Sequence, residues 1–262
     1  MPQRLGAHNE RIAFARALLT KKGRIENNAF SFEGATLLDE AVHSGIPIHE
    51  VYATERAYET TPLVHELESS KTVYLVDERT FTKISDLESP SGILTIAGLR
   101  LRSVADILRK PGVTLVLADI NDPGNAGALM RSAEAFGASG AVFGNLGVEP
   151  YHPKVVRSAM GTIFRLPLAV TDPEALRSAA ESAGASIIGL AAGHAPIGDI
   201  LAAGKAPRIR AVIVGHERHG LGRWESLCEA LTGILMQGPT ESLNAAVAGS
   251  IALYELAKAD RT

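Results

Sequence analysis

The chain has 262 residues, of which 46% are hydrophobic and 21% are charged, fractions that exclude a disordered chain and indicate a folded globular protein. Lysine and arginine number 26 against 29 acidic residues, a net charge of −3, so a nucleic-acid partner would need a local basic patch. No apolar run approaches the ~20 residues of a membrane-spanning helix, and the N-terminus lacks the apolar core of a secretory signal. The single cysteine, Cys228, cannot form an internal disulfide, and we interpret it as a packing residue of a cytoplasmic protein.

The first hundred residues alternate helical and strand patterns. Apolar residues at helical spacing predict one amphipathic helix over 11–22, ending near Gly23. Further helices are predicted at 35–44 and 62–69, and strands at 28–32, 49–54, 72–76 and 93–97. This alternation favours a small α/β domain over residues 1–100 with a mixed or parallel sheet. Pro111 and Gly112 mark the break before a more apolar second half.

The second half, residues 111–262, alternates more regularly. Strands are predicted at 113–119, 140–143, 165–170, 186–191, 211–215 and 233–236, and helices at 124–136, 152–160, 173–183 and 242–258. The strands are apolar without alternation, as expected for a parallel sheet covered by helices on both faces. Ligands of such sheets bind beyond the carboxyl ends of the strands, so the loops there are the candidate site.

The first unusual loop runs from Asp119 to Gly127 and leads into a helix that carries Arg131. Either Asn121 or Asp122 suits the cap of that helix. The guanidinium of Arg131 suits a phosphate or carboxylate ligand. The alternative is a turn-forming Asn125 and a solvated helix arginine.

The second loop, residues 215–222, follows a strand and contains three glycines around Glu217. Its sequence HERH looks like a zinc motif but lacks the i, i+4 spacing that places two histidines on one helical face. A calcium loop beginning at Asp119 also fails, because Met130 occupies the place of the bidentate glutamate. We therefore predict no metal site.

The third loop runs through residues 238–249 into an alanine-rich helix. Glu241, Ser242 and Asn244 lie at the predicted helix N-terminus, where free N–H groups favour an anionic ligand. Ser242 as a simple N-cap is the alternative. A hydrolase that uses Ser242 as nucleophile is disfavoured because no GxSxG turn presents it.

Together the three loops resemble the signature motifs of the SpoU/TrmH family of RNA ribose 2′-O-methyltransferases, within the SPOUT superfamily. The matching segments are DPGNAGALMRSAEAFG at 122–137, IVGHERHGL at 213–221 and ILMQGPTESLNAAVAGSIALYE at 234–255. The segment KKGRIENNAFSFEGATLLDEAVHSG at 21–45 is similar to the family's small L30e-like substrate-binding domain. Two positions depart from the pattern: Leu235 replaces the usual proline, and His216 stands where a small or amide residue is more common.

The resemblance implies an α/β fold whose C-terminal domain combines a parallel sheet with a deep trefoil knot that holds S-adenosylmethionine. The residues it assigns to the cofactor are Gly215, Glu217, Ile234, Met236 and Leu243. The catalytic cluster it implies is Asn125, Arg131, Ser242 and Asn244. Whether Arg131 accepts the proton of the ribose hydroxyl or clamps a phosphate stays open, since arginine normally keeps its own proton.

The expected partners are structured RNA and a second copy of the chain. Basic residues cluster in the first 24 positions, and with the resemblance Arg11, Lys21, Lys22 and Arg24 are the expected RNA contacts. The favoured substrate is 23S ribosomal RNA. The alternatives are methylation of transfer RNA and a catalytically silent RNA-binding module on the same fold.

Overall fold

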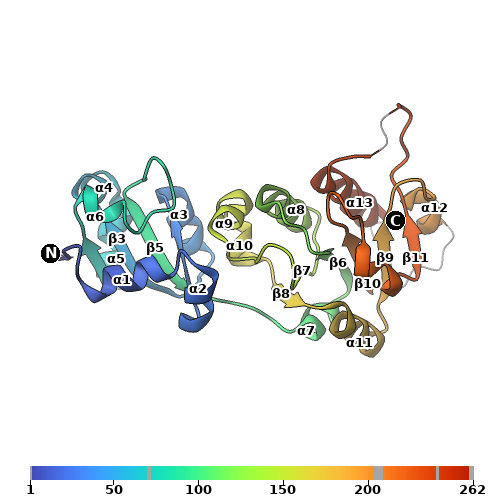
Figure 1. Cartoon of the computed structure of the whole chain (residues 1–262), viewed down its shortest axis with the longest axis horizontal. Coiled ribbons are helices and arrows are strands. Elements are labelled where there is room, and N and C mark those ends of the chain that lie inside the picture. The colour runs from blue at the N-terminus through green and yellow to red at the C-terminus, as the bar shows by residue number, and fades with distance from the viewer. Residues whose placement is uncertain (1, 70–71, 203–208, 240–241, 260–262) are drawn as a thin grey trace. The chain divides into compact units, whose positions relative to one another are not determined.

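The computed structural model of the protein describes residues 2–69, 72–202, 209–239 and 242–259 (Figure 1). The chain divides into two compact units. The first unit comprises residues 1–99 and 151–165, and the second comprises residues 100–150 and 166–262. The segment 151–165, which the sequence pattern assigned to the C-terminal domain, packs within the first unit.

The first unit contains a mixed five-stranded sheet in the order β1-β4-β3-β5-β2. Its strands are β1 (Gln3–Arg4), β2 (Ala29–Glu33), β3 (Ile48–Ala53), β4 (Thr72–Leu75) and β5 (Ile93–Gly98). Its helices are α1 (Glu10–Ala17), α2 (Lys21–Asn27), α3 (Ala35–His43), α4 (Glu55–Thr60), α5 (Pro62–Glu68), α6 (Glu78–Phe81), α9 (Pro153–Ala159) and α10 (Thr162–Arg165). β4 pairs in parallel with β1 and β3, while β5 pairs antiparallel with β2 and β3, which confirms the mixed sheet.

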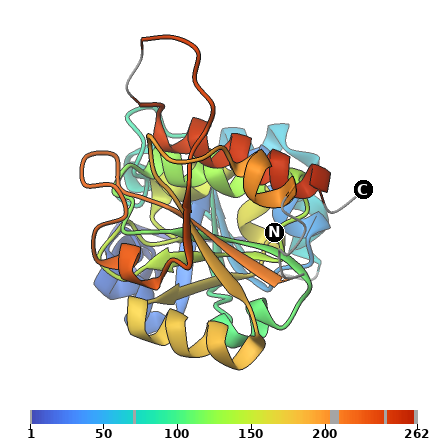
Figure 2. The ribbon, with the colours of Figure 1, turned by 90° about the vertical axis from the view of Figure 1, so that its right-hand side faces the viewer.

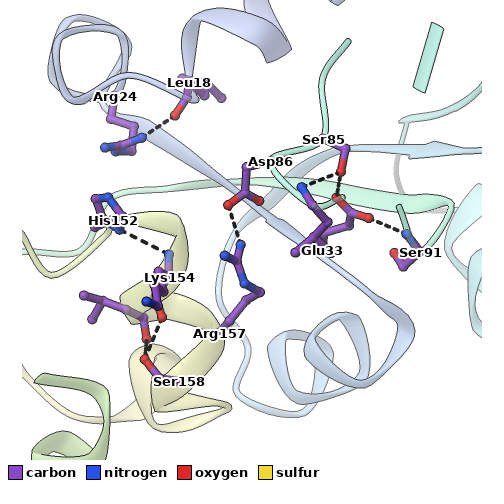
Figure 3. A network of polar contacts seen from close by, with 12 residues as sticks. Leu18, Arg24, Glu33, Ser85, Asp86, Ser91, His152, Lys154, Arg157 and Ser158 are labelled. Carbon is purple, nitrogen blue, oxygen red and sulfur yellow. Dashed lines mark hydrogen bonds and ion pairs between the residues drawn. The ribbon is translucent and has the colours of Figure 1, made fainter. Parts of the chain in front are cut away.

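Aromatic contacts hold the segment 151–165 in the first unit. The ring centroids of Phe30 and Tyr151 lie 4.5 Å apart, and those of Phe32 and Phe164 lie 4.9 Å apart. An ion pair at 2.5 Å joins Arg157 of α9 to Asp86 (Figure 3). The alternating pattern of the sequence did not reveal this insertion, because ring packing between distant segments leaves no local signal.

The predicted single helix over 11–22 is wrong, because the structure forms two helices there. Asn9 caps α1, and Thr20 caps α2 by accepting a hydrogen bond from the Gly23 backbone N–H at 3.1 Å. A threonine with this local bond favours a helix start over a helix interior, which ends α1 before it. The amphipathic spacing continues across the break and conceals it.

The second unit contains a six-stranded parallel sheet in the order β11-β9-β10-β6-β7-β8, as the apolar strands predicted. Its strands are β6 (Gly112–Leu117), β7 (Gly140–Gly144), β8 (Leu168–Thr171), β9 (Ser186–Leu190), β10 (Ile209–Val214) and β11 (Ala230–Thr232). Its helices are α7 (Val104–Leu108), α8 (Pro123–Ala135), α11 (Pro173–Ala183), α12 (Ile197–Ala202), α13 (Ala245–Ala259) and the 3-10 helix η1 (Gly222–Leu227).

Helices cover both faces of this sheet. α8 and α13 pack together on one face, and α7 and α11 lie on the other (Figures 1 and 2). The core below α7 and α11 includes the fully buried Trp224 of η1. The carboxyl ends of β6 and β10 are hydrogen-bonded neighbours, Leu117 beside Val214, so the loops that leave these strands start side by side.

Two predicted strands and one helix start in the second unit are corrected. The strand expected at 165–170 begins at Leu168, because α10 occupies 162–165 and Pro167 lacks a backbone N–H for pairing. The strand expected at 233–236 lies instead at 230–232. The final helix begins at Ala245 rather than at 242, because the Asn244 side chain accepts from the backbone N–H groups of Ala246 and Val247 at 2.8 and 3.2 Å.

Candidate functional site

The carboxyl ends of the second unit's strands surround a cavity of about 540 Å³, a size typical of small-molecule sites. Its walls come from the loops after β9, β10 and β11 and from the start of α13. Every residue predicted to hold the cofactor lines it, together with two of the predicted catalytic residues: Gly215, Glu217, Ile234, Met236, Ser242, Leu243 and Asn244. The departing residue Leu235 is 70% exposed and does not line the cavity.

The first motif is held by its aspartates. Asp122 caps α8 by accepting from the Asn125 backbone N–H at 2.7 Å, which settles the choice between Asn121 and Asp122. Asp119 adopts a left-handed conformation with φ of 55°. Its carboxylate accepts from Arg223 at 2.8 and 3.1 Å and from the Trp224 indole at 2.8 Å. These contacts fix the end of β6 against the residues that follow the second motif.

The second motif forms a tight loop. Two backbone hydrogen bonds between His216 and Gly220, at 2.8 and 3.0 Å, close it. A Cβ atom at Gly215 would lie only 2.4 Å from the Gly220 carbonyl carbon, so the chain can fold back here only because position 215 has no side chain. The closure presents Glu217 to the cavity.

A chain of side-chain hydrogen bonds joins all three motifs. The Asn244 amide donates to the Asn125 oxygen at 3.0 Å, and the Asn125 amide donates to the Glu217 carboxylate at 2.7 Å. Asn125 and Glu217 are 92 positions apart in the sequence, and Asn125 and Asn244 are 119 positions apart. The three loops that the sequence singled out therefore meet in space.

The third motif supplies the polar groups at the start of α13. Asn244 is engaged on both sides, since it caps α13 through its oxygen and donates to Asn125 through its nitrogen. Ser242 is exposed at the cavity wall and has no polar partner among the described residues. Glu241, predicted beside it, lies outside the described residues.

Arg131 lies on α8 two helical turns beyond the cap and is exposed. It does not line the cavity. In the described part of the chain no carboxylate or carbonyl pairs with its guanidinium. Arg131 is thus available to an outside ligand, while Asn125 of α8 hydrogen-bonds to Glu217 and Asn244 of the other two motifs.

Sequence reasoning missed the loop after β9. Leu190, Ala191 and Ala192 line the cavity. The carboxyl-end rule applied to every strand would have found this loop, although its small apolar residues carry no chemical signal of their own. Glu225 of η1 also lines the cavity and was not predicted.

The four basic residues predicted to contact RNA lie in the first unit and differ in exposure. Lys21 and Lys22 of α2 are exposed, and Lys22 pairs with Glu26 at 3.7 Å. Arg11 pairs with Glu50 and stacks 5.0 Å from the Tyr74 ring centroid. Arg24 is only 2% exposed and donates to the Leu18 carbonyl at 2.6 Å (Figure 3), so its side chain fastens α2 to the end of α1.

The described residues offer no metal site and no reactive thiol. They contain no cluster of three or more histidine, cysteine, aspartate or glutamate side chains arranged to hold a metal, and no helix long and apolar enough to cross a membrane. Burial raises the pKa of the Cys228 thiol to about 11, which disfavours the reactive thiolate and supports its interpretation as a packing residue.

Comparison with known proteins agrees with this geometry. Residues 112–254 match the SpoU rRNA Methylase family, and residues 9–95 match the MRM3-like substrate binding domain. A 23S rRNA (guanosine(2553)-2′-O)-methyltransferase, RlmP of Bacillus subtilis, is 28% identical over 98% of this chain and 99% of its own length.

Solved structures show the same fold. An AdoMet-bound rRNA methyltransferase from Sinorhizobium meliloti superposes with a TM-score of 0.85 at 25% identity, over 98% of this chain and 97% of the other. The SpoU methyltransferase AviRb of Streptomyces viridochromogenes, in complex with AdoMet, has a TM-score of 0.85 at 24% identity, over 97% and 99% of the two chains.

The fold and the three joined motifs define an α/β methyltransferase with a separate substrate-binding unit. Within that class, the chain belongs to the SpoU rRNA methylase family. This confirms the family and the α/β fold that the sequence motifs predicted. The trefoil knot stays a prediction.

Proposed function

We propose that the protein transfers a methyl group from S-adenosylmethionine to a ribose 2′-hydroxyl of ribosomal RNA. The observation that carries the proposal is the hydrogen-bond chain from Asn244 through Asn125 to Glu217, which joins the three family motifs at one cavity. The family match over residues 112–254 supports the reaction class.

The cavity fits the methyl donor in size and lining. Backbone at Gly215, Ile234, Met236 and Leu243 would hold it, and at position 215 a Cβ atom would break the loop that shapes the wall. The bound donor supplies an electrophilic methyl group on sulfur. The protein must align an RNA hydroxyl with that methyl, and such positioning can supply up to ~7–11 kcal/mol of the barrier.

The candidate catalytic residues divide into binding and positioning groups. Ser242, with its hydroxyl at the cavity wall, is suited to bind the substrate hydroxyl or the cofactor carboxylate. Asn244 and Asn125 position the three loops, because their amide groups are already committed to each other and to Glu217. Arg131 binds the RNA phosphate beside the target ribose as a fixed cation and orients the hydroxyl.

Ribosomal RNA is the favoured substrate. The first unit matches a substrate-binding domain, and the Bacillus relative, which aligns along the whole chain, is named a 23S rRNA methyltransferase. Exposed Lys21 and Lys22, with the outer part of Arg11, form the proposed RNA contact, while the buried Arg24 supports it from within. A ribosomal substrate and the single cysteine favour the cytoplasm.

We also propose a homodimer and a trefoil knot around the cavity. Val247 and Tyr254 lie on one face of α13, seven residues apart, and are 47% and 50% exposed. Large apolar side chains on one helix face favour burial against a second copy.

The experiment supplies labelled S-adenosylmethionine to the purified protein with unmodified ribosomal RNA or transfer RNA. Label is expected in ribosomal RNA, at a ribose whose neighbouring phosphodiester bond becomes resistant to alkaline cleavage because the 2′-oxygen is methylated. Arg131→Ala should abolish transfer and leave cofactor binding by calorimetry unchanged, whereas Arg109→Ala, on the opposite face of the sheet, controls for loss of positive charge. Label in transfer RNA alone would favour the alternative substrate, and cofactor binding without transfer to either RNA would favour the silent RNA-binding module.

A further inference from the structure

One histidine of the second motif contacts the loop that leads into the first motif. The His216 side chain reaches out of the loop 216–220 and lies 3.0 Å from the terminal amide of Asn121, in the loop that leads to Asn125. His216 also lines the cavity, and its ring centroid lies 4.8 Å from that of His219, with the two rings tilted by 35°. The side chain is only 17% exposed.

The hydrogen bonds of His216 determine which ring nitrogen carries the proton. The Arg218 backbone N–H donates to Nδ1 at 3.0 Å, and a backbone N–H can only donate, so Nδ1 carries no hydrogen. The neutral ring then carries its hydrogen on Nε2. In the structure the Asn121 amide nitrogen lies 3.0 Å from Nε2, but an amide nitrogen and a protonated Nε2 are both donors and cannot bond to each other. A half-turn of the amide, which exchanges its oxygen and nitrogen, puts the oxygen there as the acceptor of that hydrogen.

The two bonds have different effects on the site. The bond at Nδ1 is local: it comes from Arg218, two residues later, and holds the turn of the loop 216–220, here called the cofactor loop. The bond at Nε2 spans 95 residues and holds the loop of Asn121 against the loop of Glu217. It lies beside the Asn125–Glu217 bond, which joins the same two loops.

We propose that His216 is a positioning residue that, as the Nε2–H tautomer, braces the loop 119–125 against the cofactor loop. This inference rests on the proposed function, because it assigns the brace to methyl transfer. A misplacement of about 1 Å can cost about a hundredfold in rate, so a brace at this point affects turnover more than binding.

The first experiment examines the brace without any reaction. Long-range nitrogen–proton NMR of the labelled protein should show an unprotonated Nδ1 and a protonated Nε2 at His216. Asn121→Asp offers only acceptor oxygens and should preserve this tautomer, whereas Asn121→Ala should remove the Nε2 contact and shift its resonance. A hydrogen on Nδ1, or equal spectra for the two variants, would overturn the proposal.

The second experiment separates binding from turnover. In His216→Asn the shorter amide can still accept from the Arg218 N–H, so the loop turn is kept while the reach to Asn121 is lost. Cofactor affinity should stay within about twofold, and kcat should fall about tenfold or more. In His216→Ala both bonds are lost, so affinity and kcat should fall together. His194→Asn, in an exposed loop outside the cavity lining, is the matched control.

Rescue by the acceptor variant completes the test. Asn121→Asp should keep kcat within about threefold of the wild type, and Asn121→Ala should resemble His216→Asn with no further loss in the double variant. Unchanged kcat in His216→Asn, or additive losses in the double variant, would overturn the brace. If the wild-type protein binds no cofactor and transfers no methyl group, the proposed function fails, and the NMR result still decides whether the brace exists.

Discussion

The Asp119 carboxylate accepts several hydrogen bonds. It accepts two hydrogen bonds from Arg223, one from Trp224 and one from the Leu146 backbone N–H at 3.2 Å. Burial alone would raise the pKa of this carboxyl, but the donors of Arg223 and Trp224 outweigh it and hold the pKa below the ordinary value of 3.8. The folded state therefore favours the ionised form.

We expect Asp119→Asn to destabilise the fold by about 1.5–3 kcal/mol at neutral pH, because charge-assisted bonds are replaced by a neutral amide. Asparagine tolerates the left-handed backbone, so strain does not contribute. A carboxyl group with a lowered pKa stabilises the fold fully above its unfolded pKa, and this contribution is lost as the pH falls from there through the lower folded pKa. Urea unfolding from pH 7 to pH 3 should show the two proteins converging in acid. A constant difference in unfolding free energy across this range would contradict the assignment.

Asn244 combines two contacts that substitution can separate. Asn244→Asp keeps an oxygen to cap α13 but replaces the donor to Asn125, so stability should be kept while methyl transfer falls about tenfold or more. Asn244→Ala should lose both, with about 0.5–2 kcal/mol of unfolding free energy from the lost cap. Thermal unfolding and initial rates of transfer measure the two effects. Equal losses of stability in both variants would refute the separation.

At this scale the sequence predicted which residues converge but not how they are engaged. The motif positions of Asn125, Glu217 and Asn244 were sufficient to place them together. That Asn244 is occupied by a cap, and that Arg24 is buried under the end of α1, depends on side-chain directions. Residue spacing along the chain carries no information on these directions.

Among the elements, the contact of α13 with α8 depends on one small residue. A Cβ atom at Gly249 would lie 2.4 Å from Leu129 of α8 and 2.9 Å from Val214 of β10, both buried. The same helices share a hydrogen bond between Ser132 and Ser250 at 2.7 Å. The position of α13 fixes Asn244, so this packing also sets the third motif.

We expect Gly249→Ala to lower the free energy of unfolding by about 1–3 kcal/mol, because the added methyl group overpacks the contact between α13 and α8. Gly198→Ala in α12 is the matched control, since its Cβ meets no described atom within 4 Å. The control should be neutral or stabilising by about 0.4–1 kcal/mol. Chemical denaturation of both variants tests the difference, and equal unfolding free energies would show that the contact relaxes freely.

The bounds of a helix could be predicted where capping residues in the local sequence mark its ends. α11 has its expected bounds, Pro173–Ala183, because Asp172, Pro173 and Gly184 mark both ends. The break between α1 and α2 depends on the Thr20 cap, which a continuous apolar pattern conceals, and the same pattern did not give the bounds of β11.

For the molecule as a whole, the return of residues 151–165 to the first unit is the feature that local patterns could not supply. Phe30 and Phe32 are 0% and 4% exposed, and rings of the returning segment contribute to their cover. In the structure, residues 151–165 contact the first unit although they follow β6 and β7 of the second unit along the chain.

We expect a fragment of residues 1–99 to lose cooperative thermal unfolding and to bind a dye for apolar surface. Exposure of the Phe30 and Phe32 rings to water should lower the free energy of unfolding by up to about 1.5–3 kcal/mol for each ring. A peptide of residues 151–165, added in excess, should restore the transition by mass action, and a scrambled peptide should not. A sharp transition in the fragment alone would show that the segment is dispensable.

The returning segment also matters for synthesis on the ribosome. The first unit's main stretch ends at Leu99, but its last residue, Arg165, is added roughly 66 residues later. At about 5–20 residues per second, the nascent chain waits about 3–13 seconds with its aromatic surface incomplete. Two parallel strands of the next unit, β6 and β7, emerge during that interval. Vectorial translation thus delays completion of the N-terminal unit until part of its neighbour has been made, and a chaperone that shields exposed rings would act in this window.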